Sequence, residues 1–162
     1  CRKYLPQISC GLQDPRVTVL IEDGLEHVKR SAGKYDVILV DSTEPVGPAR
    51  GLFTVEFFRD VYRALKKDGI MAAQTESPFV NRELIKEVFA GLGGVFPLAR
   101  LYLASVPTYP SGLWSFIAAS KCYDPKNCRQ KPVETKYYNF AVHGAAFCLP
   151  GFVRELIGGK EQ

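Results

Sequence analysis

The sequence predicts an α/β fold in which helices cover a mainly parallel β-sheet. Short apolar runs alternate with stretches of helical periodicity along the chain, which is typical of strands and crossover helices. The run VILV at residues 37–40 consists of β-branched residues and leucine, as expected of a strand that is buried on both faces. The length of 162 residues suits one domain spanning residues 1–162, since single domains commonly run about 100 to 200 residues.

The first predicted elements are two strands with a short helix between them. The run VTVLI predicts a strand at residues 17–21, which ends in the sequence EDG at residues 22–24. A short helix is expected at residues 25–30. The second strand follows at residues 37–40 and leads into a loop that contains two prolines and a glycine.

The middle of the chain predicts a helix, a strand and a second helix. Residues 54–66 place apolar side chains at helical spacing, and Thr54 is suited to cap the N-terminus. The sequence KKDG at residues 66–69 is expected to end this helix, because lysines complement the last turn and glycine suits the turn. A strand is expected at residues 70–74 and a helix at residues 81–89.

Two further strands and a helix are expected in the last third of the chain. Residues 98–106 and 114–120 are apolar runs that flank the short sequence PTYPSG at residues 107–112. Because so few residues separate them, they are predicted to pair as an antiparallel hairpin. A loop follows, and then a helix within residues 147–157, with Pro150 near its start.

The composition argues against nucleic acid and membranes as partners. The net charge of +4 comes from 21 basic and 17 acidic residues, an excess that is small and dispersed. The visibly basic stretch at residues 121–136 is interrupted by prolines and has no aromatic ladder, so it is expected to be a solvated loop. No apolar run reaches the roughly 18 residues that a membrane span needs.

The cysteines indicate reduced thiols in a cytoplasmic protein. There are five, an odd number, and none are in a CxxC pair. Cys122, Cys128 and His143 are only three candidate metal ligands, and their spacing is irregular for zinc. No metal site is therefore predicted.

Acidic residues follow three of the predicted strands. They are Asp23, Asp41 with Glu44, and Glu76. In open α/β sheets, ligands bind outside the carboxyl ends of the strands, so acids grouped there favour a cationic or hydroxyl-rich ligand. Any single one of them could instead cap a helix or interact with its dipole.

The loop DSTEPVGPA that begins at Asp41 is predicted to be rigid and non-helical. Pro45 disfavours a helical conformation at Glu44, and Pro48 resists one after it. A carboxylate in a partly desolvated cleft attracts an alkylammonium and can then accept its proton. We therefore predict that Glu44 holds the ammonium group while Asp41 acts as the base.

The sequence TYPSG carries a second candidate residue. The phenol of Tyr109 could hydrogen-bond an amine or close a pocket over an aliphatic chain. The alternative is a turn tyrosine that packs on the sheet, and the residues alone do not separate the two. Trp114 is expected to pack in the core or at the sheet edge, and His27 and His143 are expected to be isolated surface or core residues.

Taken together, these motifs resemble the polyamine aminopropyltransferases, and among them the bacterial spermidine synthases. The resemblance covers essentially the whole chain. Its segments are EDG (22–24), YDVILVDSTEPVGPA (35–49), GLFTVEFF (51–58), DGIMAAQTESP (68–78), YLASVPTYPSGLWSF (102–116) and ETKYYNFAVHGAAFCLPGFV (134–153). The loop D-S-T-acid-P-x-G-P combined with P-T-Y-P-S-G is a highly specific combination.

The resemblance implies a Rossmann-like sheet of the class I methyltransferase type. It also implies transfer of an aminopropyl group from decarboxylated S-adenosylmethionine to putrescine, which yields spermidine and methylthioadenosine. By this resemblance Asp41 deprotonates the attacking amine, and the diamine is bound by Asp41, Ser42, Thr43, Glu44 and Tyr109. Many family members have aspartate where this chain has Glu44, a departure expected to affect acceptor fit more than chemistry.

The resemblance assigns the nucleoside to a second group of residues. Asp23 and Gly24 match the pair that holds the adenine amino group, and Pro48 matches a proline that lines the nucleoside site. Decarboxylated S-adenosylmethionine is a co-substrate, so neither a metal nor a tightly bound cofactor is implied. The full enzyme is expected to be a cytoplasmic homodimer or homotetramer.

Parts of the family pattern are missing from this sequence. Family members open with a small β-rich domain and carry a glycine-rich nucleotide loop and a ribose-binding acid, whereas the GLGG at residues 91–94 follows a predicted helix. We therefore expect a C-terminal portion of a longer enzyme, poorly active alone, with strand edges unpaired between residues 17–21 and 37–40. The alternatives are an S-adenosylmethionine-dependent methyltransferase and an inactive fragment that acts only as a binding partner.

Overall fold

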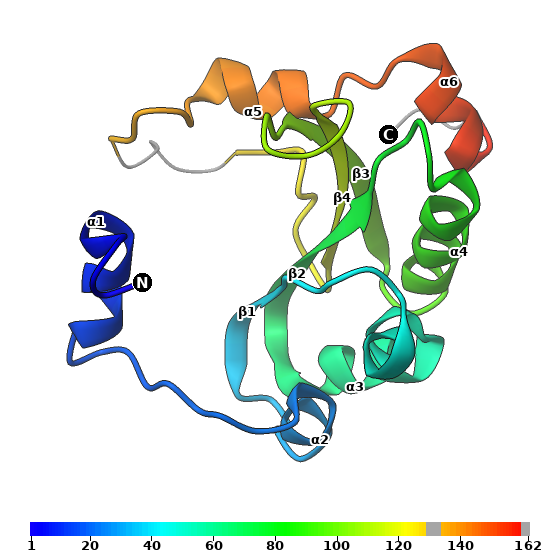
Figure 1. The fold of residues 1–162 in the computed structure, drawn as a ribbon. Coiled ribbons are helices and arrows are strands. Elements are labelled where there is room, and N and C mark those ends of the chain that lie inside the picture. The colour runs from blue at the N-terminus through cyan, green and yellow to red at the C-terminus, as the bar shows by residue number, and fades with distance from the viewer. Residues whose placement is uncertain (129–133, 160–162) are drawn as a thin grey trace.

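A computed structural model describes residues 1–128 and 134–159, and its centre is a four-stranded sheet of order β1-β2-β4-β3 (Figure 1). The strands are β1 (Tyr35–Val40), β2 (Leu65–Glu76), β3 (Leu98–Ser105) and β4 (Leu113–Ser120). Strands β1 and β2 are parallel, and β4 is antiparallel to both of its neighbours. Three strands thus run in one direction, which confirms the predicted mainly parallel α/β sheet with an antiparallel hairpin.

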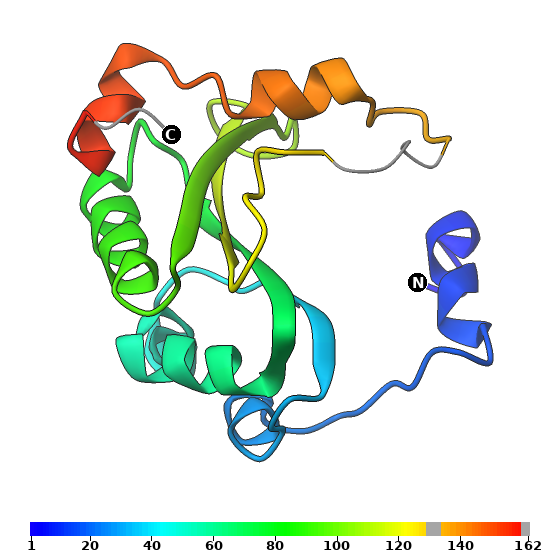
Figure 2. The ribbon, with the colours of Figure 1, turned by 180° about the vertical axis from the view of Figure 1, so that it is seen from behind.

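Helices of different lengths connect and cover these strands. They are α1 (Pro6–Ser9), η1 (Cys10–Gln13), α2 (Gly24–Lys29), η2 (Gly47–Phe53), α3 (Val55–Ala64), α4 (Arg82–Gly93), α5 (Phe140–Ala146), α6 (Gly151–Arg154) and η3 (Glu155–Ile157). Figures 1 and 2 show α3 and α4 on one side of the sheet, with α6 beyond the end of α4. Helix α5 lies across the end of the β3–β4 hairpin.

The hydrophobic core lies between the sheet and the layer formed by α3 and α4. Along β2, Met71 and Ala73 are buried on this side, while the alternate residues are only half-buried. Val61 of α3 and Ile85 of α4 are fully buried against them. As predicted, Thr54 caps α3, since its hydroxyl accepts a hydrogen bond of 3.2 Å from the backbone N–H of Phe57.

The opposite face of the sheet is covered only in part. Helix α5 packs against β3 on this side. Strand β1 forms one edge of the sheet, and its side chains Val37 and Leu39 are 53% and 75% exposed. Leu39 is paired with Ala72 of β2, so this open area continues from the edge strand toward the middle of the sheet.

The predicted strand at residues 17–21 is wrong. These residues form irregular chain, and the side chain of Ile21 is 99% exposed. No strand among residues 1–128 and 134–159 pairs with them, and a β-branched run becomes a strand only where a neighbour satisfies its backbone. Figures 1 and 2 show α1 and this connection standing away from the sheet, beside its open edge.

Several element boundaries also differ from the predictions. Strand β2 begins at Leu65, so the sequence KKDG lies within this strand. The pairing of β2 with β1 is irregular there, because Tyr35 pairs with Leu65 but Val37 pairs with Ile70. Helix α4 continues to Gly93, so most of GLGG is helical. Helix α5 lies where a loop was expected, because the side chain of Asn139 caps it by accepting from the N–H of Val142.

Candidate functional site

The predicted amine-binding loop begins where β1 ends, at the carboxyl ends of the parallel strands. Asp41 directly follows Val40 and is exposed. The side-chain amide of Gln74 on β2 donates to the backbone carbonyl of Ser42 and accepts a hydrogen bond of 3.3 Å from the indole N–H of Trp114. This amide ties the start of the loop to two strands of the sheet.

The rest of the loop is turned tightly, but it is not free of helix. The N–H of Val46 donates to the carbonyl of Glu44 at 2.7 Å, and the guanidinium of Arg50 donates to the carbonyl of Pro45 at 3.2 Å. The 3₁₀ helix η2 then begins at Gly47, with Pro48 in its first turn. The expectation that Pro48 resists a helix was therefore wrong here, because proline is tolerated where the first N–H groups have no helical partner.

The turn that carries Tyr109 is held by its own backbone and by β2. The N–H of Val106 donates to the carbonyl of Gly112 at 2.8 Å. Ser111 adopts a left-handed φ of 72°, and its hydroxyl is 2.9 Å from that of the buried Ser77, just after β2. Non-glycine residues in this conformation persist only where the surroundings hold them, so the position of the turn is well determined.

Asp41 and Tyr109 line the same cavity. It has a volume of about 320 Å³, and its wall includes Gln74 together with apolar side chains of β1, β2, β3 and β4. The ring of Tyr109 lies against that of Trp114, with centroids 4.3 Å apart. Tyr109 therefore packs against Trp114, as in the alternative considered for it, and it also lines the cavity that Asp41 lines.

Glu44 is not among the described residues that line this cavity, and its charge acts on a different acid. Of the described residues that line the cavity, none is Ser42, Thr43 or Glu44. Burial raises the pKa of Glu76, the amide of Asn81 opposes this by donating at 3.3 Å, and the charge of Glu44 raises it further. Asp41 and Tyr109 thus line one cavity, whereas the charge of Glu44 acts on the pKa of Glu76.

Glu76 itself is held in a strained conformation at the end of β2. It is only 6% exposed and has a φ of 84°. The hydroxyl of the buried Ser115 donates to its carbonyl at 2.6 Å. A buried, strained acid at the carboxyl end of a strand is typical of a functional position, and only its place after a predicted strand pointed to it in the sequence.

The residues predicted to hold the nucleoside lie on α2 and η2. The carboxylate of Asp23 caps α2 by accepting from the N–H groups of Leu25 at 2.8 Å and Glu26 at 3.4 Å. Both bonds use the same oxygen, so this oxygen has the helix-capping role that was the alternative to ligand binding. A Cβ atom on Gly51 would lie 2.7 Å from the side chain of Leu25. This close packing brings the start of α2, with Gly24, next to the helix that carries Pro48.

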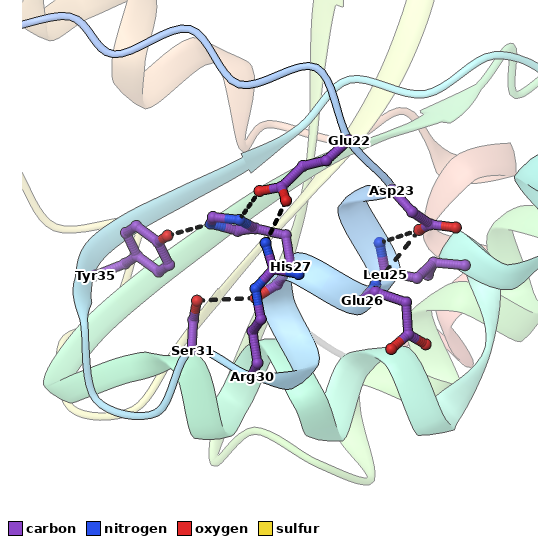
Figure 3. Close-up of polar contacts among 8 residues, drawn as sticks. All are labelled: Glu22, Asp23, Leu25, Glu26, His27, Arg30, Ser31 and Tyr35. Atoms are coloured by element: carbon purple, nitrogen blue, oxygen red, sulfur yellow. Dashed lines mark hydrogen bonds and ion pairs between the residues drawn. The ribbon is translucent and has the colours of Figure 1, made fainter.

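His27 is not isolated, which corrects the sequence prediction. Figure 3 shows Glu22, His27 and Tyr35 pointing toward one another. The two ring nitrogens of His27 lie 2.5 Å from the carboxylate of Glu22 and 2.5 Å from the hydroxyl of Tyr35, and Arg30 forms an ion pair with Glu22. The hydrogen bonds from Arg30 and His27 lower the pKa of Glu22, and the network fixes the EDG turn against α2 and β1.

Gln74 is the main residue that sequence reasoning missed. The signal was an amide among small apolar residues in the strand sequence MAAQTE. An amide at a half-buried strand position needs hydrogen-bond partners, which indicates a polar neighbour across the sheet. Trp114 is 8% exposed and packs as expected, and its indole N–H supplies one of those partners.

His143 also has partners. Its ring nitrogens lie 3.0 Å from the hydroxyl of Tyr138 and 3.2 Å from the carbonyl of Lys126. Within residues 1–128 and 134–159, no three His, Cys, Asp or Glu side chains come together in a way that could hold a metal ion. Part of the basic stretch predicted to be a solvated loop, residues 129–133, lies outside the described residues.

The apolar segments of the chain are short. In the described part of the chain, no single helix is long and apolar enough to cross a membrane, and only the bent pair Phe140–Ala146 and Gly151–Ile157 meets both criteria together. The five cysteines form no disulfide bonds, and all five are exposed.

Comparison with known proteins identifies relatives along nearly the whole chain. The profile of the spermine/spermidine synthase domain matches residues 1–131. The polyamine aminopropyltransferase of Moorella thermoacetica is 56% identical over 99% of this chain, and that of Bacillus subtilis is 51% identical over 96%. The chain spans 58% of the length of each of these relatives.

Solved structures agree with the sequence comparison. A spermidine synthase in complex with the transition state analogue AdoDATO is 44% identical and superposes with a TM-score of 0.88 over 98% of this chain and 57% of its own. The spermidine synthase of Thermotoga maritima gives a TM-score of 0.85 at 44% identity, over 98% of this chain and 56% of its own. These names do not favour the methyltransferase alternative. The chain belongs to the spermine/spermidine synthase family.

Proposed function

We propose that the protein is a spermidine synthase, which transfers the aminopropyl group of decarboxylated S-adenosylmethionine to putrescine. The observation that carries this proposal is the cavity that Asp41 and Tyr109 share at the carboxyl ends of the parallel strands. Family membership supports the reaction class. The combination of an acid and a phenol beside an apolar wall suits an alkyl diamine, which has an amine at each end of a methylene chain.

The chemistry asks little of the protein beyond placing and deprotonating an amine. The carboxylate of Asp41 accepts a proton from the ammonium of the diamine, which frees the nitrogen lone pair. The nitrogen then attacks the carbon of the aminopropyl group that is bonded to the sulfonium sulfur. A new C–N bond forms as this C–S bond breaks. The electron pair of the broken bond stays on sulfur, which becomes the thioether of methylthioadenosine. Holding the two reactants in line accounts for much of the rate acceleration.

The remaining acids fit the second charge of the diamine. The charge of Glu44 raises the pKa of Glu76, and Glu76 is buried. Two neighbouring carboxylates repel each other, so a cation between them is stabilised by both. In this proposal the distal ammonium binds there, assisted by Ser42 and Thr43 of the same loop, while Asp23, Gly24 and Pro48 hold the nucleoside.

The wider setting of the enzyme is also part of the proposal. Five exposed cysteines that form no disulfide bonds suit the reducing environment of the cytoplasm. The reaction as written needs no metal and no tightly bound cofactor, because the sulfonium is already a good leaving group. A homodimer or homotetramer remains the expected assembly.

The substitution Asp41→Asn tests the proposal in the complete gene product. We expect the release of methylthioadenosine in the presence of putrescine to fall about 10²–10⁴-fold, the usual contribution of a general base. Asp36→Asn is the matched control, because Asp36 is the second residue of the strand that precedes Asp41 and forms a surface ion pair with Lys66 at 2.7 Å. Near-normal turnover by Asp41→Asn would rule out its role as base, and an inactive wild-type enzyme would rule out the reaction.

A further inference from the structure

A second and larger cavity lies on the same side of the sheet as the candidate site. Its volume is about 720 Å³, and it is enclosed by β3, the start of β4 and α5. Its wall is mainly aromatic and aliphatic, and none of its described lining residues is Asp, Glu, Lys or Arg. The aromatic members are Tyr102, Tyr137, Tyr138, His143 and Phe147.

Tyr102 is the aromatic residue that lines both cavities. Its ring stacks on Phe116, which lines the smaller cavity, with centroids 5.2 Å apart. It also contacts Phe147, which lines the larger cavity, with centroids 5.5 Å apart. Tyr102 is half-buried in this position, and its side chain contributes to the walls of both cavities.

The larger cavity has the chemistry to accept the extended part of a linear polyamine. Methylene groups gain free energy when they leave water for an apolar wall. A protonated amine is attracted to the faces of aromatic rings, and the hydroxyls of Tyr137 and Tyr138 offer hydrogen-bond acceptors. Among the residues that the structure describes, no Lys or Arg that would repel such a cation lines this cavity.

We propose that Tyr102 sets the length of the amine acceptor, because its ring is shared by the wall of the cavity that holds Asp41 and Tyr109 and the wall of the larger aromatic cavity. This inference rests on the proposed function. It assigns to the wild-type protein a preference for a short diamine, and it makes the larger cavity the space that a linear triamine would occupy once the ring is removed.

The test compares putrescine with spermidine as acceptors in the complete gene product, with methylthioadenosine release as the readout. Tyr102→Ala is expected to raise the ratio of kcat/KM for spermidine to that for putrescine by about tenfold or more, the scale on which pockets discriminate chain length. Tyr102→Leu should raise the ratio less. Tyr102→Phe keeps the ring and serves as the matched control, with the ratio unchanged.

Each outcome decides a different point. If Tyr102→Ala retains its thermal unfolding transition and the ratio stays at the wild-type value, the inference is wrong although the reaction stands. A series of linear diamines of increasing length on the wild-type enzyme needs no variant: kcat/KM should fall sharply beyond one length, and equal use of putrescine and spermidine would overturn the role of Tyr102. If the wild-type enzyme uses no amine at all, the proposed function fails and this inference fails with it.

Discussion

The two faces of the sheet are made by the same four strands but differ in how they are covered. On one face, α3 and α4 bury residues such as Met71 and Ile117 completely. On the other, Leu39 is 75% exposed, and the cavity with Asp41 and Tyr109 opens beside it. We call the face under α3 and α4 the closed face and the opposite one the open face. The packing on the closed face keeps the strands rigid, and these strands position the polar groups on the open face.

This division explains why the candidate site is precise although much of it lies in loops. The amide of Gln74 and the hydroxyl of Ser77 reach from β2 and the residue after it to the two loops. Because β2 also carries buried residues on the closed face, both loops are fixed to the most stable part of the molecule.

The largest loss of stability is expected from a truncation on the closed face. Ile117→Ala removes a fully buried side chain from the centre of β4 and should lower the free energy of unfolding by about 2–5 kcal/mol, since the cavity it leaves cannot collapse completely. Urea denaturation of the wild-type and variant chains measures the difference. A loss below about 1 kcal/mol would mean that this face is not the tightly packed one.

A smaller loss is expected where the two faces are joined. Gln74→Leu leaves the carbonyl of Ser42 and the indole N–H of Trp114 without their partner, and an unsatisfied buried group costs about 1–3 kcal/mol. The KM for putrescine should also rise, because the loop that begins at Asp41 loses its anchor. If KM and the midpoint of urea denaturation both stay at wild-type values, the amide does not position this loop.

The buried acid at the end of β2 predicts a change that depends on pH. The pKa of Glu76 is raised above its ordinary value of 4.5, chiefly by burial, so the folded state binds the proton more tightly than the unfolded state does. Stability contributed by this group is therefore lost as the pH rises from about 4.5 through the raised pKa. Glu76→Gln cannot ionise, and its melting temperature relative to the wild type should rise over that range.

The control for this measurement is an exposed glutamate. Glu83 lies in the first turn of α4 and forms an ion pair with Lys86. Glu83→Gln should show no comparable increase in relative melting temperature with pH. A difference between Glu76→Gln and the wild type that is constant from pH 4 to pH 8 would argue against a burial effect.

The smallest effect is expected on the open face. In a protein of these 162 residues, Leu39→Ser should change the free energy of unfolding by less than about 0.5 kcal/mol, as is usual for exposed positions. Urea denaturation of Leu39→Ser and Ile117→Ala under the same conditions compares the stability that each face contributes. A loss at Leu39 approaching that at Ile117 would show that the open face is covered in solution.

Most elements could be predicted because their signals are local. The apolar spacing and the cap at Thr54 indicated α3, and the few residues between two apolar runs indicated the hairpin of β3 and β4. The strand expected at residues 17–21 failed because a strand also needs a neighbour, which no local pattern supplies. The helical turn at Gly47 was missed because proline was weighed as a breaker and not as a starting residue.

By itself the sequence determined the class of the sheet, the loop that follows β1 and the candidate residues Asp41 and Tyr109. Alternation, caps and proline positions act over a few residues, so they can be read along the chain. Only the tertiary structure decided that Asp41 shares a cavity with Tyr109 while the charge of Glu44 acts on Glu76. It also decided that Gln74 joins the loop to the sheet, because such contacts depend on strand order and register, which bring together residues that are far apart in sequence.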